Sequence, residues 1–131
     1  MSESTYDIVI LGAGSGGYAT ALRAAQLGMK VALIDGDKVG GTCLHRGCIP
    51  TKAYLHAAEL AEEAREASKV GVNAVLQSIE MGKVRDYKDN IVSGKFKGLA
   101  GLLKMKGVEV IPGEGKLTAQ DTITVGGVEY K

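Results

Sequence analysis

The chain has 131 residues, of which 45% are hydrophobic and 24% charged, a composition typical of one soluble globular domain rather than a disordered segment. Its formal net charge of +1 argues against an extended basic surface for nucleic acid or for an anionic membrane. The sequence has neither a basic segment leading into an apolar run nor a span of about 20 apolar residues, so we expect a cytoplasmic protein with no membrane partner. Its nineteen glycines are about twice the usual share, which indicates backbone that turns tightly or approaches a ligand.

The chain opens with the pattern of a strand, a helix and a second strand. Residues 6–11 form a short apolar run, as expected of a buried strand in a parallel sheet. Small and apolar residues recur at helical spacing over residues 17–27, and Gly28 is expected to end that helix in a left-handed conformation. Residues 30–35 predict a second buried strand, which completes a βαβ unit with a right-handed crossover.

The middle of the chain predicts a loop followed by helices. The loop covers residues 36–41, and a helix opens over residues 42–47. Pro50 is expected in the first turn of a longer helix that extends to residue 68. Its predicted inward face follows a 4-3-4-3 spacing: Ala53, Ala57, Leu60, Ala64 and Ala67.

The remaining sequence predicts a long helix and then strands. The helix covers residues 81–106 and ends at Gly107, and its inward face is Val92, Phe96, Leu99 and Leu103. Residues 108–111 predict a third buried strand. Three short alternating segments follow, with Gly126 and Gly127 as a hairpin turn: residues 116–119, 122–125 and 128–130. The sequence therefore predicts an α/β fold, a partial Rossmann-like domain of three parallel strands with helices plus a small antiparallel β-meander, with no repeat or linker.

A glycine-rich segment joins the first strand to the first helix. Gly12, Gly14 and Gly17 form the pattern G-x-G-x-x-G, in which they permit a tight turn, close approach to a pyrophosphate and close helix–strand packing. Asp35 ends the second strand, where a carboxylate accepts hydrogen bonds from an adenosine ribose and disfavours a 2′-phosphate. The pattern predicts a dinucleotide site but does not distinguish FAD from NAD. The alternative is a glycine-rich turn with no ligand.

The two cysteines lie close together in the sequence. Residues five apart on a regular helix, as Cys43 and Cys48 would be, lie about 8–9 Å apart, beyond disulfide reach. A bridge between them requires a distorted turn, which Gly47 and Pro50 can supply. A strained and accessible disulfide of this kind is readily reduced, so the pair suits dithiol–disulfide exchange.

The surrounding charges point to the same chemistry. Arg46 and Lys52, together with a helix N-terminus, are expected to lower a thiol pKa and favour the thiolate. One alternative is a pair of buried, inert thiols. The other is a structural zinc site made of Cys43, Cys48, His45 and His56, although no second C-x-x-C or H-x-x-x-H pair is present.

These motifs together resemble those of the flavoprotein disulfide reductases. The resemblance lies in the glycine loop, in GGTC at residues 40–43 and in CIPTK at residues 48–52, and it covers essentially the whole chain. Leu44 and residues 49–52 are more similar to the members that oxidise dihydrolipoamide than to those that act on glutathione or mercuric ion. The resemblance implies that the dinucleotide at the glycine loop is FAD.

The resemblance also implies a set of cofactor-binding residues: Gly12, Gly14, Gly17, Asp35, Gly41, Thr42, Lys52 and Gly115. Asp35 would hold the adenosine ribose, and Gly41 and Thr42 would line the pyrophosphate. Lys52 would lie beside the flavin N5, and Gly115 would contact the adenine through its backbone.

The implied catalytic residues are the two cysteines. Cys43 would be the interchange thiol that meets the substrate, and Cys48 the thiol that faces the flavin. The implied substrate is the dihydrolipoamide of 2-oxo acid dehydrogenase complexes or of the glycine cleavage system, with NAD as the final acceptor. The complete enzyme would be a homodimer.

The sequence departs from the family in two respects. Asp35 stands where the family usually has Glu, which shortens the reach to the ribose by one methylene. No second G-x-G-x-x-G is present, so no NAD site is expected in this chain. We expect residues 1–131 to be the N-terminal part of an FAD-binding domain, inactive alone, without the NAD, central and dimerisation domains. The alternatives are a stand-alone flavin- or nucleotide-binding module with a redox dithiol and no turnover, and a thiol–disulfide switch without a cofactor.

Overall fold

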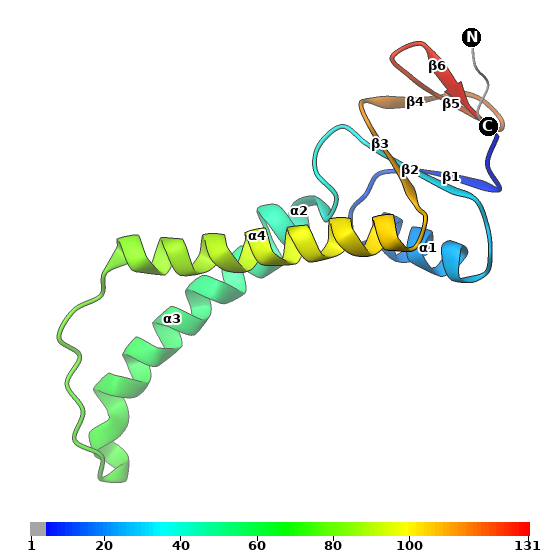
Figure 1. The fold of residues 1–131 in the computed structure, drawn as a ribbon. Helices are drawn as coiled ribbons and strands as arrows, with labels where there is room; N and C mark the ends of the chain where they lie inside the picture. The colour runs from blue at the N-terminus through cyan, green and yellow to red at the C-terminus, as the bar shows by residue number, and fades with distance from the viewer. Residues whose placement is uncertain (1–4) are drawn as a thin grey trace.

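Helices and two small sheets make up the part of the chain that the structure, a computed structural model, describes: residues 5–131 (Figure 1). The elements follow in the order β1 (Ile8–Leu11), α1 (Ser15–Gln26), β2 (Val31–Asp35), α2 (Gly41–His45), α3 (Cys48–Glu66), the 3-10 turn η1 (Ala67–Val70), α4 (Met81–Met105), β3 (Glu109–Pro112), β4 (Gly115–Ala119), β5 (Thr122–Val125) and β6 (Val128–Tyr130). The predicted α/β class is confirmed.

Strand β2 is the centre of a parallel sheet with the order β1-β2-β3. Its side chains alternate between two buried faces, because successive residues of a strand point to opposite sides. Val31 and Leu33 belong to the core under the helices, and Ala32 and Ile34 to the core under the second sheet. Burial on both faces explains why this strand is a continuous apolar run in the sequence, as the prediction assumed.

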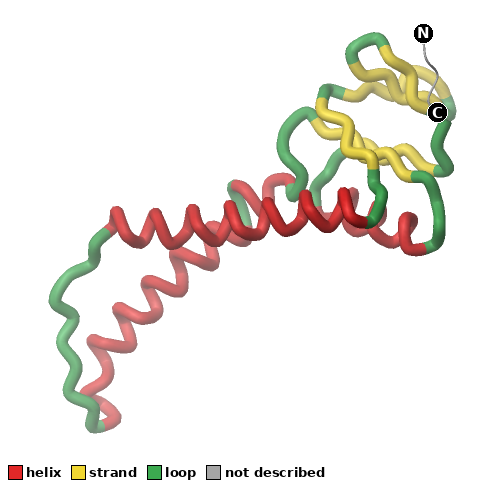
Figure 2. Tube along the Cα trace, viewed as in Figure 1, coloured by secondary structure: helices red, strands yellow, loops and turns green. Residues whose placement is uncertain are grey.

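The part of the molecule that contains the two sheets has three layers (Figure 2). Helices α1 and α4 cover one face of the parallel sheet, and the antiparallel sheet β4-β5-β6 covers the other. The predicted hairpin turn is confirmed, since Gly126 and Gly127 both have positive φ, 55° and 84°, as a tight type I′ connection requires. The backbone N–H of Tyr6 donates to the carbonyl of Lys131 at 2.6 Å and joins β6 to the segment before β1.

Helices α3 and α4 form a long hairpin that extends away from the sheets (Figure 1). The predicted inward face of α3 is partly wrong, because Leu60 is 53% exposed whereas Ala53 and Ala61 are buried. The contact face follows small residues four apart, which allow α4 to approach closely. Leu60 lies about 100° around the helix from Ala61 and therefore falls outside that face.

Three further expectations need correction. Helix α3 ends at Glu66, and residues 71–80 form an extended connection with no helix or strand, where no linker was expected. Gly71 has φ of 82°, a left-handed conformation that ends the helical turn. The two outer strands of the sheet are not fully buried: no residue of β1 is buried and Leu11 is 49% exposed, while in β3 only Ile111 is buried and Val110 is 40% exposed.

None of the helices within residues 5–131 is both long and apolar enough to cross a membrane.

Replacing Gly17 by alanine is expected to destabilise the fold by about 2–4 kcal/mol. The added Cβ would lie 1.8 Å from the carbonyl oxygen of Gly12, so strand or helix must shift. Gly16→Ala is the matched control in the same helix, because its Cβ would meet nothing within 4 Å. We expect that control to be neutral or stabilising by about 0.5–1 kcal/mol. Urea unfolding followed by circular dichroism measures both, and equal stability of the two variants would contradict this packing.

Candidate functional site

The glycine loop lies between β1 and the N-terminus of α1. Gly12 has φ of 99°, and its N–H donates to the carbonyl of Ile34 at 2.7 Å, which ties the turn to β2. Gly17 packs directly against Gly12, because a Cβ added at Gly17 would lie only 1.8 Å from the carbonyl oxygen of Gly12. A Cβ at Gly14, in contrast, would meet nothing within 4 Å, so open space lies at the start of the helix.

A second glycine pair holds the next loop against the first. The N–H of Gly40 donates to the carbonyl of Ala13 at 2.8 Å. A Cβ at Gly41 would lie 2.7 Å from the Cα of Gly14, so the two backbones touch without room for a side chain. Gly41 begins α2, and Thr42 follows it in that helix. The segment that carries the first cysteine is therefore fixed to the glycine loop.

The carboxylate of Asp35 fastens the same loop. Its Oδ2 accepts a hydrogen bond from the N–H of Ala13 at 2.6 Å, and its Oδ1 accepts one from the N–H of Asp37 at 2.8 Å. Both oxygens are thus engaged by backbone amides. The sequence correctly predicted that Asp35 ends the second strand, but it did not predict these two hydrogen bonds.

A cavity of about 400 Å³ opens beside this loop. Its lining residues come from the ends of β1 and β2 and from the β3–β4 connection: Leu11, Gly12, Asp35, Gly36, Asp37, Glu114 and Gly115. Three predicted residues, Gly12, Asp35 and Gly115, are thereby brought together. A Cβ at Gly115 would lie 2.6 Å from the Cδ1 of Leu11 and 3.0 Å from the Cγ2 of Ile34, so the strand passes close to both side chains.

The two cysteines lie on either side of a break between helices. Cys43 is in α2, and Cys48 is the first residue of α3. Gly47 separates the helices, and its added Cβ would lie 2.9 Å from the carbonyl oxygen of Thr42. The distorted turn predicted from the sequence is present. Both thiols are free; Cys43 is half-buried and Cys48 exposed, so the alternative of a buried, inert pair is wrong.

The pKa of the Cys43 thiol is raised above its ordinary value, chiefly by its side-chain hydrogen bond to Cys48 and then by burial. Lys52 acts in the opposite direction, but as the smallest of these influences. The predicted lowering of a thiol pKa is therefore wrong for Cys43. The reason is that the Cys43 S–H donates a hydrogen bond to the sulfur of Cys48, which stabilises the neutral thiol of Cys43.

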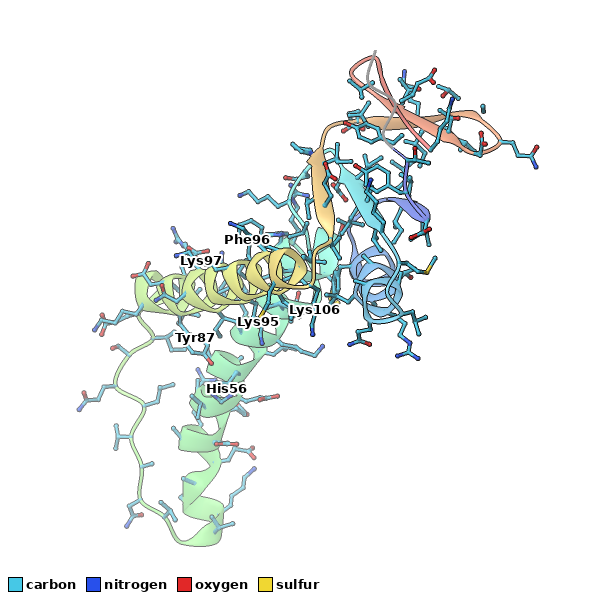
Figure 3. The ribbon with its side chains drawn as sticks, turned by 45° about the vertical axis from the view of Figure 1, so that its right-hand side comes forward. His56, Tyr87, Lys95, Phe96, Lys97 and Lys106 are labelled. Carbon is cyan, nitrogen blue, oxygen red and sulfur yellow. The ribbon has the colours of Figure 1, made fainter. Side chains whose placement is uncertain are left out.

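The two histidines serve separate contacts and do not join the cysteines. The Nε2 of His45 donates to the carbonyl of Val39 at 2.9 Å, and its ring meets Phe96 of α4 edge-on at 5.3 Å. The ring of His56 lies 6.2 Å from that of Tyr87, farther along the helix pair (Figure 3). Within residues 5–131, no three His, Cys, Asp or Glu side chains form a group able to hold a metal ion, so the zinc alternative is not supported.

The site as a whole fits a dinucleotide next to a dithiol. The open space at Gly12, Gly14 and Gly16 is a cradle that any Cβ would occupy. It lies at the positive end of the twelve-residue helix α1, where backbone N–H groups favour phosphate. The cavity of about 400 Å³ opens beside the same loop, and Lys52, one turn into α3, acts to lower the pKa of the Cys43 thiol.

Comparisons with known proteins agree with this arrangement. A family model described as pyridine nucleotide-disulphide oxidoreductase matches residues 6–131. The chain is 46% identical over 112 residues to dihydrolipoyl dehydrogenase of Bacillus subtilis, a match that covers 86% of this chain and 24% of the relative. It is 44% identical over 126 residues to the mitochondrial dihydrolipoyl dehydrogenase of Dictyostelium discoideum, a match that covers 95% of this chain and 26% of the relative. The chain spans about a quarter of the length of the curated relatives it matches.

Cys48→Ala is expected to lower the pKa of Cys43, because it removes the hydrogen bond that raises this pKa most. A lower pKa leaves more thiolate at about pH 8, so iodoacetamide should alkylate Cys43 faster. Lys52→Met should slow the same reaction, since it removes the cation that lowers the pKa. Alkylation rates of Cys43 measured by mass spectrometry from about pH 7 to 11 test both directions. A slower Cys43 in Cys48→Ala would overturn the assignment of the hydrogen bond.

Proposed function

The chain belongs to the pyridine nucleotide-disulphide oxidoreductase family, and from this premise we propose that it forms the FAD-binding and thiol-bearing part of a dihydrolipoyl dehydrogenase. The observation that carries the proposal is the backbone contact between Gly41 and Gly14. It is so close that a Cβ added at Gly41 would lie 2.7 Å from the Cα of Gly14. It joins a phosphate-sized cradle to the helix that bears Cys43. A redox cofactor and a dithiol must be held at a fixed distance to exchange electrons, and this contact supports such an arrangement.

The cofactor residues of the proposal follow the shape of the site. Gly12, Gly14 and Gly17, with the N-terminus of α1, would hold the pyrophosphate, aided by Gly41 and Thr42. The cavity lined by Asp35 and Gly115 would receive the adenosine half of FAD. Lys52 would lie at the flavin end, where a cation stabilises negative charge on the reduced ring. When bound, FAD supplies the two-electron acceptor that takes electrons from the dithiol and passes them on as a hydride to NAD.

The thiols would act through disulfide exchange. With Cys43 and Cys48 oxidised to a disulfide, one thiolate of dihydrolipoamide attacks the sulfur of Cys43 and displaces the Cys48 thiolate. The second thiolate of the substrate then attacks the substrate sulfur of this mixed disulfide and releases Cys43. Lipoamide leaves as a cyclic disulfide, and the protein keeps two electrons as the dithiol. The interaction between the two thiols supports this step, because the Cys48 side chain is the main cause of the raised pKa of Cys43 and only the turn at Gly47 separates their helices.

The exposure of the thiols bears on their roles. Cys48 is exposed and Cys43 half-buried, which by itself would favour Cys48 as the thiol that meets the substrate. We assign the opposite roles, because bound FAD would cover Cys48 and leave Cys43 as the sulfur reached by dihydrolipoamide. This assignment rests on the family resemblance of the CIPTK segment, residues 48–52.

The remaining parts of the proposal concern the whole protein. Its partners would be the dihydrolipoamide groups of 2-oxo acid dehydrogenase complexes or of the glycine cleavage system. The NAD site, the central and dimerisation domains would lie outside these 131 residues, in keeping with the 24–27% of the relatives that the chain covers. A homodimeric assembly and a cytoplasmic location belong to the same proposal.

Gly14→Ala is expected to weaken FAD binding by about tenfold or more while leaving the fold intact. Its Cβ would enter the open cradle without meeting any protein atom within 4 Å. Gly94→Ala in α4 is the matched control, because its Cβ also meets nothing within 4 Å and the residue belongs to another helix, outside the glycine loop. Quenching of FAD fluorescence on titration with the chain measures affinity. A folded wild-type chain that does not bind FAD would refute the proposal, and equal affinities of the variants would refute the role of Gly14.

Bound FAD is expected to protect Cys48 from alkylation and to leave Cys43 largely reactive. The reduced chain would be treated with iodoacetamide with and without saturating FAD, and the two cysteine peptides quantified by mass spectrometry. Because Cys48 is the more exposed thiol in the free chain, its protection must come from the cofactor. Protection of Cys43 alone would reverse the proposed roles. Riboflavin at equal concentration controls for nonspecific quenching of the reagent.

A further inference from the structure

We propose that Glu114 is a second carboxylate of the adenosine cavity and that it selects an adenosine with free ribose hydroxyls over one that carries a 2′-phosphate. The inference rests on the proposed FAD-binding function and extends it to a residue that the family resemblance did not assign. It depends on three features of the structure. The Glu114 carboxylate lies against Gly36, both oxygens of Asp35 accept backbone hydrogen bonds, and the residues that line the cavity include no cation.

The Glu114 carboxylate occupies the space above Gly36. A Cβ added at Gly36 would lie 2.0 Å from its Oε1 and 2.6 Å from its Cδ. Gly36 is not among the glycines with positive φ, so its backbone conformation does not require glycine. The Glu114 carboxylate thus fills the space that a side chain at position 36 would need. Both residues line the cavity of about 400 Å³.

The backbone on both sides of Glu114 is fixed to the cavity wall. The N–H of Gly113 donates to the backbone carbonyl of Asp35 at 2.9 Å. On the other side, an added Cβ at Gly115 would lie 2.6 Å from the Cδ1 of Leu11 and 3.0 Å from the Cγ2 of Ile34. The side chain of Glu114 therefore starts from a defined point beside Asp35, although it comes from a distant part of the sequence.

Asp35 alone is poorly placed to bind the ribose. Its two oxygens already accept backbone N–H groups from Ala13 and Asp37, and its side chain is one methylene shorter than the glutamate usual in the family. Each carboxylate oxygen has a second lone pair, so each oxygen of Asp35 can still accept one more hydrogen bond. Glu114 supplies a second and longer carboxylate to the lining of the same cavity, beside Asp35. Hydroxyl and exocyclic amino groups of adenosine are the donors that a carboxylate accepts.

The charges that line the cavity disfavour a phosphate on the ribose. Of its charged lining residues, Asp35, Asp37 and Glu114, all are acidic. Two cations act on Asp37, and neither lines the cavity: Arg46 is ion-paired with it at 2.6 Å, and the Nζ of Lys38 lies 6.0 Å from the centre of the Phe96 ring. A 2′-phosphate would bring further negative charge against Asp35 and Glu114 with no lining cation to receive it.

The test compares the affinities of ADP-ribose and 2′-phospho-ADP-ribose, measured by competition with FAD. Wild type is expected to prefer ADP-ribose, and Glu114→Gln to reduce this preference by about fivefold. Gly36→Ala should reduce it similarly, because the new Cβ displaces only the flexible end of Glu114. In the Glu114→Gln background, Gly36→Ala should have little additional effect. Glu63→Gln on α3 is the control that makes the same change in net charge at a distance.

Each outcome bears on the inference. An unchanged preference in folded Glu114→Gln overturns it, even if FAD still binds and the proposed function stands. A loss of preference in Glu63→Gln equal to that in Glu114→Gln also overturns it, since net charge alone would then explain the effect. A folded wild-type chain that binds neither FAD nor ADP-ribose overturns both the inference and the proposed function. Circular dichroism establishes folding in every variant.

Discussion

The site depends on one contact between two pieces of backbone. Gly40 donates to the carbonyl of Ala13, and Gly41 lies against Gly14 at a distance that excludes any side chain. Because α2 begins at Gly41, the position of Cys43 is set by the glycine loop rather than by side-chain packing. Backbone contacts of this kind vary less than contacts between long side chains, which lose rotamer entropy when held in place. The glycine loop and the thiol-bearing helix are thus joined directly through their backbones.

The parallel sheet provides the base for that unit. Strand β2 is buried on both faces, and each of its large apolar side chains contributes about 1.5–3 kcal/mol when removed from water. The carboxyl ends of β1 and β2 lie at one edge of the sheet, and the glycine loop and the cavity open there. This is the edge at which open α/β sheets commonly bind ligands. The most buried strand of the sheet therefore supports the glycine loop and the cavity directly.

Features determined by neighbouring residues could be predicted, and those determined by distant ones could not. The helix ends at Gly28 and Gly107 and the βαβ unit follow from local patterns, and all are present. The exposure of Leu60 depends on how α3 is rotated against α4, which its own spacing does not specify. Likewise, the raised pKa of Cys43 depends on a hydrogen bond across the break between two helices. Glu114 was missed because its contact with Gly36 links distant parts of the chain; the signal available was its place between two glycines.

The break at Gly47 also bears on the stability of the fold during oxidation and reduction. A disulfide between Cys43 and Cys48 would close a loop of residues 43–48 alone. In the chain-entropy account, so short a loop restricts the unfolded chain by about 2 kcal/mol, against about 4.7 kcal/mol for a loop of 100 residues. Opening the bridge would then remove little of the cross-link stabilisation that a long-range disulfide gives. With the helices already held by Gly41 and Gly14, the sulfurs could change oxidation state without the surrounding structure loosening.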